Sequence, residues 1–225
     1  MEPTSSMKQN RRRQHLLGIV LILLVAGGWL LPPLGYFMVF CMVMAMGIGA
    51  VKGRSWCDWM CPRGSFWDGF MGRISRKARV PGFFRSTPFR LLWLGLLMTM
   101  LAVNLRPVWG DYYRMGKPFV MILTVTTAVG LVLGVLFHPR IWCMFCPMGT
   151  MANWLGRRRK PLLVDEGCIG CGLCEKVCRM QIYPGAYRET GAVTHGDCLK
   201  CSYCVERCPQ KALRFQTARK EEEAC

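Results

Sequence analysis

Long uncharged stretches dominate the N-terminal part of the chain. No residue of Leu16–Val51 is charged, and two shorter uncharged runs follow at Leu91–Leu105 and Pro118–Phe137. The first run would extend for roughly 54 Å as a single helix, whereas the hydrocarbon core of a bilayer is only about 30 Å thick. The run must therefore fold back. We expect the break at Pro32 and Pro33, because proline lacks the backbone N–H and clashes with the preceding turn.

The pattern predicts an α-helical membrane protein with four transmembrane helices in two hairpins. The third run is short for a span, but Arg90 and Arg106 flank it, and long basic side chains can reach the membrane interfaces. Buried helices of a soluble protein are the alternative, which two such hairpins in a short chain disfavour. The expected spans are Leu16–Leu31, Gly35–Val51, Leu91–Leu105 and Pro118–Phe137.

Basic residues are distributed unevenly around these spans. The chain holds 30 Lys and Arg against 13 Asp and Glu, a formal net charge of +17. The basic residues concentrate before the first span, between the second and third, and after the fourth. By the positive-inside rule, we expect a multi-pass protein of the cytoplasmic membrane with both termini in the cytoplasm. The long apolar runs make membrane lipid, and not nucleic acid, the expected partner of this charge. A cleaved signal peptide is the competing interpretation of the first span, although no convincing cleavage site follows it.

A similar cysteine motif follows each predicted hairpin. The first copy reads Trp-Cys-Asp-Trp-Met-Cys-Pro-Arg-Gly-Ser from Trp56, and the second reads Trp-Cys-Met-Phe-Cys-Pro-Met-Gly-Thr from Trp142. The shared order of Trp, Cys, Cys-Pro, Gly and a hydroxyl residue indicates an internal repeat. The second copy has one residue fewer between its cysteines. We call these segments the Cys-Pro motifs, and their cysteines are Cys57, Cys61, Cys143 and Cys146.

Eight further cysteines fall in two equally spaced runs after about Pro161, where the composition changes. Both runs follow C-x2-C-x2-C-x3-C, the spacing of bacterial two-cluster ferredoxins. In that arrangement three cysteines of one run hold a cubane and the fourth ligates the other cluster. The expected ligands of the first [4Fe–4S] cluster are Cys168, Cys171, Cys174 and Cys208. Those of the second are Cys198, Cys201, Cys204 and Cys178.

Zinc and disulfides are the alternative uses of these cysteines. Structural zinc takes four ligands in pairs, and not two runs of four in ferredoxin register. Disulfides are disfavoured in the cytoplasm, where the charges place this region. Gly170 and Gly172 allow the tight curvature that a cluster-binding loop needs. Arg179 stands where proline usually follows the fourth cysteine, a departure that does not touch a ligand.

These features predict a membrane part followed by a small α+β ferredoxin domain. The expected segments are a basic cytoplasmic tail (1–15), the first transmembrane hairpin (16–52), a cytoplasmic loop with the first motif (53–88), the second hairpin (89–138), a cytoplasmic segment with the second motif (139–160), the two-cluster ferredoxin domain (161–217) and a tail (218–225).

Four spans, a Cys-Pro motif after each hairpin and a C-terminal two-cluster ferredoxin region together resemble the NapH/MauN-type membrane ferredoxins. The polyferredoxin parts of NosR-like proteins are similar. Members of the family typically carry C-x3-C-P in both copies, whereas this sequence has C-x2-C-P at Cys143 and Cys146. The resemblance implies an electron-transfer subunit of a quinol dehydrogenase-type complex. Such a subunit relays electrons between the quinone pool and a redox partner such as a ferredoxin, cytochrome or reductase. The similarity to NosR-like proteins leaves a second function open, that of a redox-sensing regulatory or maturation protein.

The role of the Cys-Pro motifs stays open between three interpretations. The two pairs converge to share a third iron–sulfur centre, each pair is a redox-active dithiol, or Cys-Pro ends a span and packs beside tryptophan. His138, at a span end, is a candidate quinone contact, with a locally hydrogen-bonded histidine as the alternative. Cys41 is expected to be a small apolar residue within its span, and Cys225 has no assigned role. No acid pair or Ser-His-Asp arrangement is visible, so quinone oxidation or reduction is the most chemistry that we expect.

Overall fold

A computed structural model describes residues 5–156 and 159–216 of the chain. Within these residues, four helical segments are long and apolar enough to cross a membrane. The prediction of a helical membrane part with four apolar helices is confirmed. Its long helices are α1 (Ser5–Leu30), α2 (Tyr36–Lys52), α5 (Thr87–Leu105) and α6 (Gly116–Leu136).

The break between α1 and α2 lies at the predicted proline pair. A short 3-10 helix, η1 (Pro32–Gly35), replaces the α-helical turn there. Because Gly35 and Gly116 lack a Cβ, the turn packs backbone against backbone on the start of α6. A Cβ at either position would overlap main-chain atoms of the other segment.

The N-terminal helix is longer than the predicted span. It begins at Ser5 and continues through the basic segment that we expected to be a tail. No proline or glycine interrupts this segment, so nothing in it stops the helix. The extension matters because Gln14 is buried and reaches the C-terminal region, where its Oε1 accepts a hydrogen bond from Arg179 at 3.4 Å. Cys225 and the predicted tail 218–225 lie outside the described residues, as do residues 157 and 158 of the basic run 157–160.

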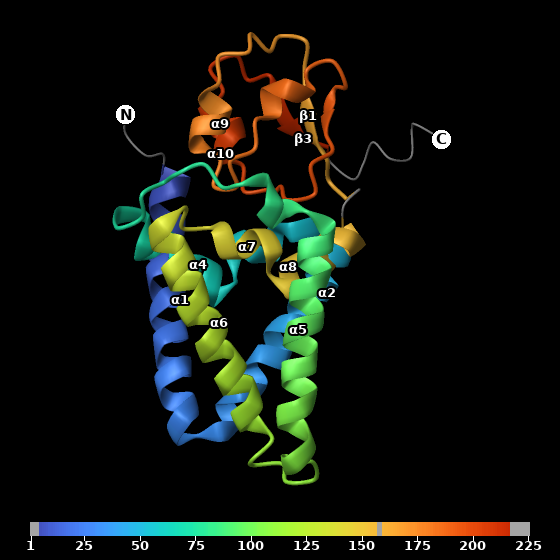
Figure 1. The fold of residues 1–225 in the computed structure, drawn as a ribbon. Coiled ribbons are helices and arrows are strands. Elements are labelled where there is room, and N and C mark those ends of the chain that lie inside the picture. Colours follow the sequence, from blue (N-terminus) through green and yellow to red (C-terminus); the bar gives the residue numbers. More distant parts are fainter. Residues whose placement is uncertain (1–4, 157–158, 217–225) are drawn as a thin grey trace.

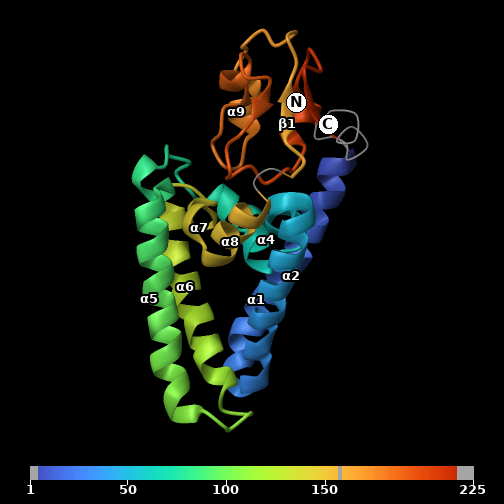
Figure 2. The same cartoon turned by 90° about the vertical axis from the view of Figure 1, so that its right-hand side faces the viewer.

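Short helices occupy the space between the two pairs of long helices (Figure 1). Figure 2 shows that the pair α1 and α2 and the pair α5 and α6 meet at the end far from the C-terminal region and separate towards it. In the widening gap, α4 packs against α1 and α8 packs against α2. The short helices are α3 (Trp56–Trp59), α4 (Pro62–Gly69), α7 (Ile141–Phe145) and α8 (Pro147–Gly156). Three further 3-10 turns are η2 (Gly53–Ser55), η3 (Met71–Arg73) and η4 (Gly82–Arg85), and η5 (Arg106–Val108) lies between α5 and α6.

The C-terminal region caps the wide end of the helices (Figure 1). It has a three-stranded antiparallel sheet in the order β2-β1-β3. The strands are short, so loops and one-turn helices make up most of the region. Its elements are β1 (Leu162–Val164), α9 (Leu173–Val177), η6 (Pro184–Tyr187), β2 (Ala192–Val193), α10 (Tyr203–Arg207) and β3 (Leu213–Phe215).

Candidate metal centres

The cysteines of the C-terminal region line two separate cavities. Each cavity combines three cysteines of one run with the fourth cysteine of the other run, because α9 and α10 pack side by side. The first cavity is lined by Cys168, Cys171, Cys174 and Cys208, among other residues. The second is lined by Cys178, Cys198, Cys201 and Cys204.

Left-handed backbone shapes both loops. Gly170 and Gly172 have φ angles of 71° and 72°. The corresponding residues of the second loop, Lys200 and Ser202, have φ angles of 56° and 66° although they carry side chains. Sequence reasoning found the glycines and missed the other two, because lysine and serine do not signal this conformation. Such turns can aim backbone N–H groups at an anionic centre.

The thiols of the second cavity are costly to ionise without a metal. Burial raises the pKa of Cys204 to about 12, and the N–H of Val205 acts in the opposite direction. Burial also raises the pKa of Cys201 well above its ordinary value. A coordinating metal deprotonates such thiols outright. No three His, Cys, Asp or Glu side chains of the described residues gather closely enough to hold a single metal ion. A cubane, whose four thiolates each bind a different iron, suits the cysteine-lined cavities better.

The four cysteines of the Cys-Pro motifs lie in one region between the long helices. Cys57 and Cys143 are buried in the same core, and Cys61 and Cys146 line a common cavity. In each motif the second cysteine directly precedes a helix that begins at proline, a residue that suits the first helical position. Cys61 is the N-cap of α4, and its Sγ accepts a hydrogen bond from the N–H of Gly64 at 3.5 Å.

Two arginines connect the motifs reciprocally. Arg54 donates to the carbonyl oxygen of Cys143 at 2.5 Å, and Arg140 donates to that of Cys57 at 2.9 Å. Each arginine stands three residues before the first cysteine of its own motif and contacts the first cysteine of the other. Sequence reasoning missed both residues. The available signal was the recurrence of arginine at the same position before both motifs.

The glycine that follows Cys-Pro in each motif makes room for the arginine of the other motif. A Cβ on Gly64 would lie 2.9 Å from Nη1 of Arg140. A Cβ on Gly149 would lie 2.5 Å from Nη2 of Arg54. The repeated glycine therefore has a steric reason that the sequence pattern alone does not give.

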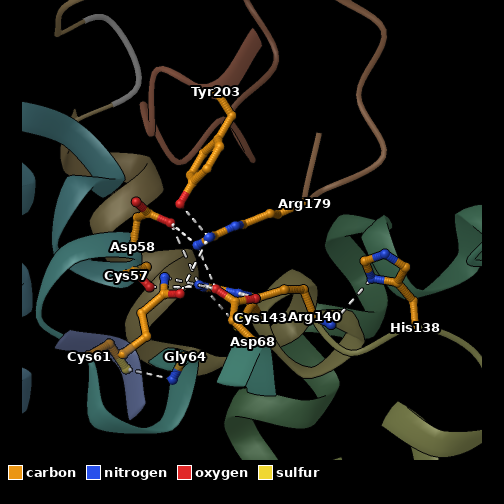
Figure 3. Close-up of polar contacts among 11 residues, drawn as sticks. Cys57, Asp58, Cys61, Gly64, Asp68, His138, Arg140, Cys143, Arg179 and Tyr203 are labelled. Carbon is orange, nitrogen blue, oxygen red and sulfur yellow. Dashed lines mark hydrogen bonds and ion pairs between the residues drawn. The ribbon is translucent and has the colours of Figure 1, made fainter. Parts of the chain in front are cut away.

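A buried cluster of charges joins the first motif to the C-terminal region (Figure 3). Arg179 donates to Asp58 at 2.8 Å and to Asp68 at 2.6 Å. Its guanidinium also lies over the ring of Tyr203 at 4.2 Å. Nε of Arg140 donates to Asp68 at 2.8 Å. The arginine that replaces the usual proline after Cys178 thus binds two carboxylates of the membrane part.

A second buried cluster lies beside the other motif. Asp197, directly before Cys198, accepts hydrogen bonds from Arg54 and Arg90, both at 2.7 Å. The side chains of Asp197 and Arg54 are each 2% exposed, and that of Arg90 is 8% exposed. Through these two clusters the membrane helices hold residues adjacent to Cys178 and Cys198 of the second cavity.

The remaining candidates are His138 and Cys41. Nδ1 of His138 accepts a hydrogen bond from the N–H of Arg140 at 3.2 Å. Burial lowers the pKa of His138 to about 4, and the charge of Asp68 opposes that shift. His138 is not among the residues that line the cavity of Cys61 and Cys146. Cys41 is buried in its span and lines that cavity.

Comparisons with known proteins agree with these cysteine arrangements. A family model of a 4Fe-4S binding domain matches residues 34–81 and 120–163, each of which contains one Cys-Pro motif. A family model of a 4Fe-4S dicluster domain matches residues 167–213. No solved structure matches the chain.

Several relatives are similar over most of the chain, and three of them have descriptive names. The methylamine utilization ferredoxin-type protein MauN of Methylobacillus flagellatus is 28% identical over 73% of this chain and 62% of its own. The ferredoxin-type protein NapH of Haemophilus influenzae is 23% identical over 78% of this chain and 66% of its own. The protein YccM of Escherichia coli is 24% identical over 80% of this chain and 55% of its own.

Apolar helices and iron–sulfur binding domains in one chain define a membrane-bound iron–sulfur protein of the ferredoxin type. Within that class, the similarity to MauN and NapH, at 28% and 23% identity, supports an iron–sulfur electron-transfer protein of the NapH/MauN type.

Proposed function

We propose that the protein is a membrane-anchored subunit that relays electrons between the quinone pool and a partner oxidoreductase. The observation that carries this proposal is the succession of cysteine sites. The cysteines of the Cys-Pro motifs lie between apolar helices. Two buried ion clusters hold the second cavity of the C-terminal region against these motifs. Such a succession suits electron transfer between a membrane and a soluble partner.

The two cavities of the C-terminal region support two [4Fe–4S] clusters in the proposed domain 161–217. We assign Cys168, Cys171, Cys174 and Cys208 to the first cluster. We assign Cys178, Cys198, Cys201 and Cys204 to the second. The cysteine sets of the cavities and the match to a dicluster domain both support this assignment. When bound, such clusters accept and release single electrons, while this chain fixes their spacing.

We assign the cysteines of the Cys-Pro motifs to a third iron–sulfur centre. Three observations favour shared ligation over a dithiol in each motif. The reciprocal arginine contacts bring the two motifs together, Cys57 and Cys143 are buried in the same core, and a 4Fe-4S binding domain matches both segments. The guanidinium groups of Arg54 and Arg140 offset the negative charge of four thiolates in a buried site.

Iron and sulfide analysis of the purified protein tests this assignment. Three cubanes require about 12 irons per chain and two require about eight. We expect Cys57→Ser to lower the count from about 12 to about eight, with loss of one signal in low-temperature electron paramagnetic resonance. Cys41→Ser is the matched control, since Cys41 is buried nearby but outside the proposed ligand set. An unchanged count in Cys57→Ser would eliminate the third centre, and fewer than about eight irons in the wild type would refute the relay.

The partner is proposed to dock over the first cluster. Cys171 is exposed, and the neighbouring Ile169 is 64% exposed. The second cavity, in contrast, faces the membrane helices through Arg179 and Asp197. A partner captured from mild detergent would be released by Ile169→Glu and retained by a charge change on the opposite end of the protein, such as Asp111→Asn. Equal retention by both variants would exclude this face.

The orientation is proposed from the charges, with the C-terminal region in the cytoplasm. A fluorescent protein that matures only in the cytoplasm should glow when it is fused to the C-terminus. A phosphatase that is active only in the periplasm should be silent at the same position. The reverse pattern would overturn the orientation.

A further inference from the structure

A partly open cavity of about 70 Å³ lies directly beside two cysteines of the Cys-Pro motifs. Its wall is formed by side chains of α1, η1, α2, α4, α6 and α8 together with Cys61 and Cys146. The residues that matter to the argument below are Phe37, Met38, Cys61, Arg63, Cys146 and Met148. Apart from Arg63, every lining residue is apolar or carries sulfur.

Arg63 is an unusual residue for this position. None of the ion pairs among the described residues includes it. Its Nη2 donates to the carbonyl oxygen of Leu123 at 3.1 Å and to the hydroxyl oxygens of Thr126 and Thr127 at 2.8 Å and 3.0 Å. Its Nε is buried and has no hydrogen-bond partner among the described residues. The Arg63 guanidinium also lies over the ring of Trp142, at 5.2 Å from its centroid, which partly offsets the cost of burying the charge. The N–H at Nε still lacks a partner, which is costly in a buried position, and a buried cation at membrane depth indicates function.

The cavity therefore requires an occupant with three properties. Its body must be apolar, because the walls are apolar and belong to membrane helices. It must carry a hydrogen-bond acceptor, because Arg63 offers an unused N–H. It must be able to exchange electrons with the centre proposed for the Cys-Pro motifs, because Cys61 and Cys146 form part of the wall. A quinone has a carbonyl acceptor on a flat apolar ring, and it dissolves in the bilayer.

We propose that this cavity receives the carbonyl edge of a quinone ring, and that Arg63 donates a hydrogen bond to the carbonyl oxygen. Phe37 and Met38 contact the ring from α2, and Met148 contacts it from α8. The inference deepens the proposed relay and rests on it, because it names the place where the membrane substrate meets the Cys-Pro site. His138 takes no part, since it lies outside the cavity.

Binding of decylubiquinone to the purified, iron-loaded protein in detergent, measured by calorimetry, tests the proposal. Met38→Trp should abolish binding because it fills the cavity and leaves Arg63 intact. The matched control is Leu96→Trp on α5, where Leu96 is 56% exposed and lies outside the cavity. Arg63→Gln should weaken binding about 10- to 100-fold, because it removes a charge-assisted hydrogen bond. Arg114→Gln is its control, since that side chain is 73% exposed.

A parallel measurement separates this inference from the proposed function. In the same samples, decylubiquinol should reduce the clusters of the wild type and of Leu96→Trp but not those of Met38→Trp. If the quinol reduces the clusters of every variant and Met38→Trp binds normally, the relay stands and the cavity is not the quinone site. If the wild type neither binds the quinone nor is reduced by the quinol, the relay itself fails. Phosphatidylglycerol that copurifies with the wild type and is lost from Met38→Trp, with no quinone binding, would make the cavity a lipid site and overturn the inference.

Discussion

Replacing Asp197 by asparagine tests whether the buried ion cluster holds the C-terminal region on the membrane helices. The carboxylate lies between Arg54 and Arg90, at 2.7 Å from each. All three side chains are 8% exposed or less. Asp197→Asn preserves the shape of the side chain and removes its charge, so two guanidinium groups remain buried without a counter-ion.

The expected loss is large because the pair is buried. Removing one partner of a buried ion pair costs about 3–5 kcal/mol, and the amide of asparagine keeps part of the hydrogen bonding, so we expect about 3 kcal/mol. For a chain of 225 residues, each kcal/mol corresponds to about 2–4 °C in Tm, which gives a fall of roughly 6–12 °C.

Thermal unfolding in mild detergent measures this effect, with Asp165→Asn as the matched control. Asp165 pairs with Arg214 at 3.1 Å, but these side chains are 42% and 64% exposed. An exposed pair contributes about 0–1 kcal/mol. The double variant Asp197→Asn, Arg90→Met should recover part of the loss, because it removes one of the two unpaired charges. Equal Tm values for Asp197→Asn and Asp165→Asn would refute the reasoning.

Three further predictions follow from the same contacts. Gly149→Ala should lower the free energy of unfolding by about 1–3 kcal/mol, because its Cβ would displace the guanidinium of Arg54. Gly47→Ala should raise the free energy of unfolding by up to about 1 kcal/mol, because the space around its Cβ is open. A denaturant titration that ranks the two variants the other way would contradict this. Because the pKa of His138 is about 4 in the folded protein against an ordinary 6.5, the unfolded chain takes up its proton first as the pH falls, so stability is lost between these values. His138→Gln should remove about 1 kcal/mol of that loss at pH 5, after allowance for partial exposure, and Tm values of both proteins at pH 7 and pH 5 measure it. Arg179→Gln should lower the free energy of unfolding by at least about 2 kcal/mol, because Asp58 and Asp68 lose one of their two arginine partners. An unchanged Tm would show that Arg140 alone is enough for both carboxylates.

Much of the architecture follows from local sequence. Uncharged runs located the four apolar helices to within a few residues at most ends, because a bilayer demands length and apolarity from each helix separately. The proline pair located the first break for an equally local reason. The spacing of the C-terminal cysteines predicted cluster-binding loops, since ligands of one loop are only a few residues apart.

Only the tertiary structure decided which distant residues meet. Asp197 is more than a hundred residues from Arg54 and Arg90 in the chain, and no local pattern encodes such a pairing. The same holds for Arg179, which the sequence marked only as a departure from proline and which the fold places on Asp58 and Asp68. The cavity wall beside Arg63 likewise comes from helices that are adjacent only after folding. Side-chain direction and the packing of separate helices fix these contacts, whereas helix length, helix breaks and loop spacing are properties of short segments.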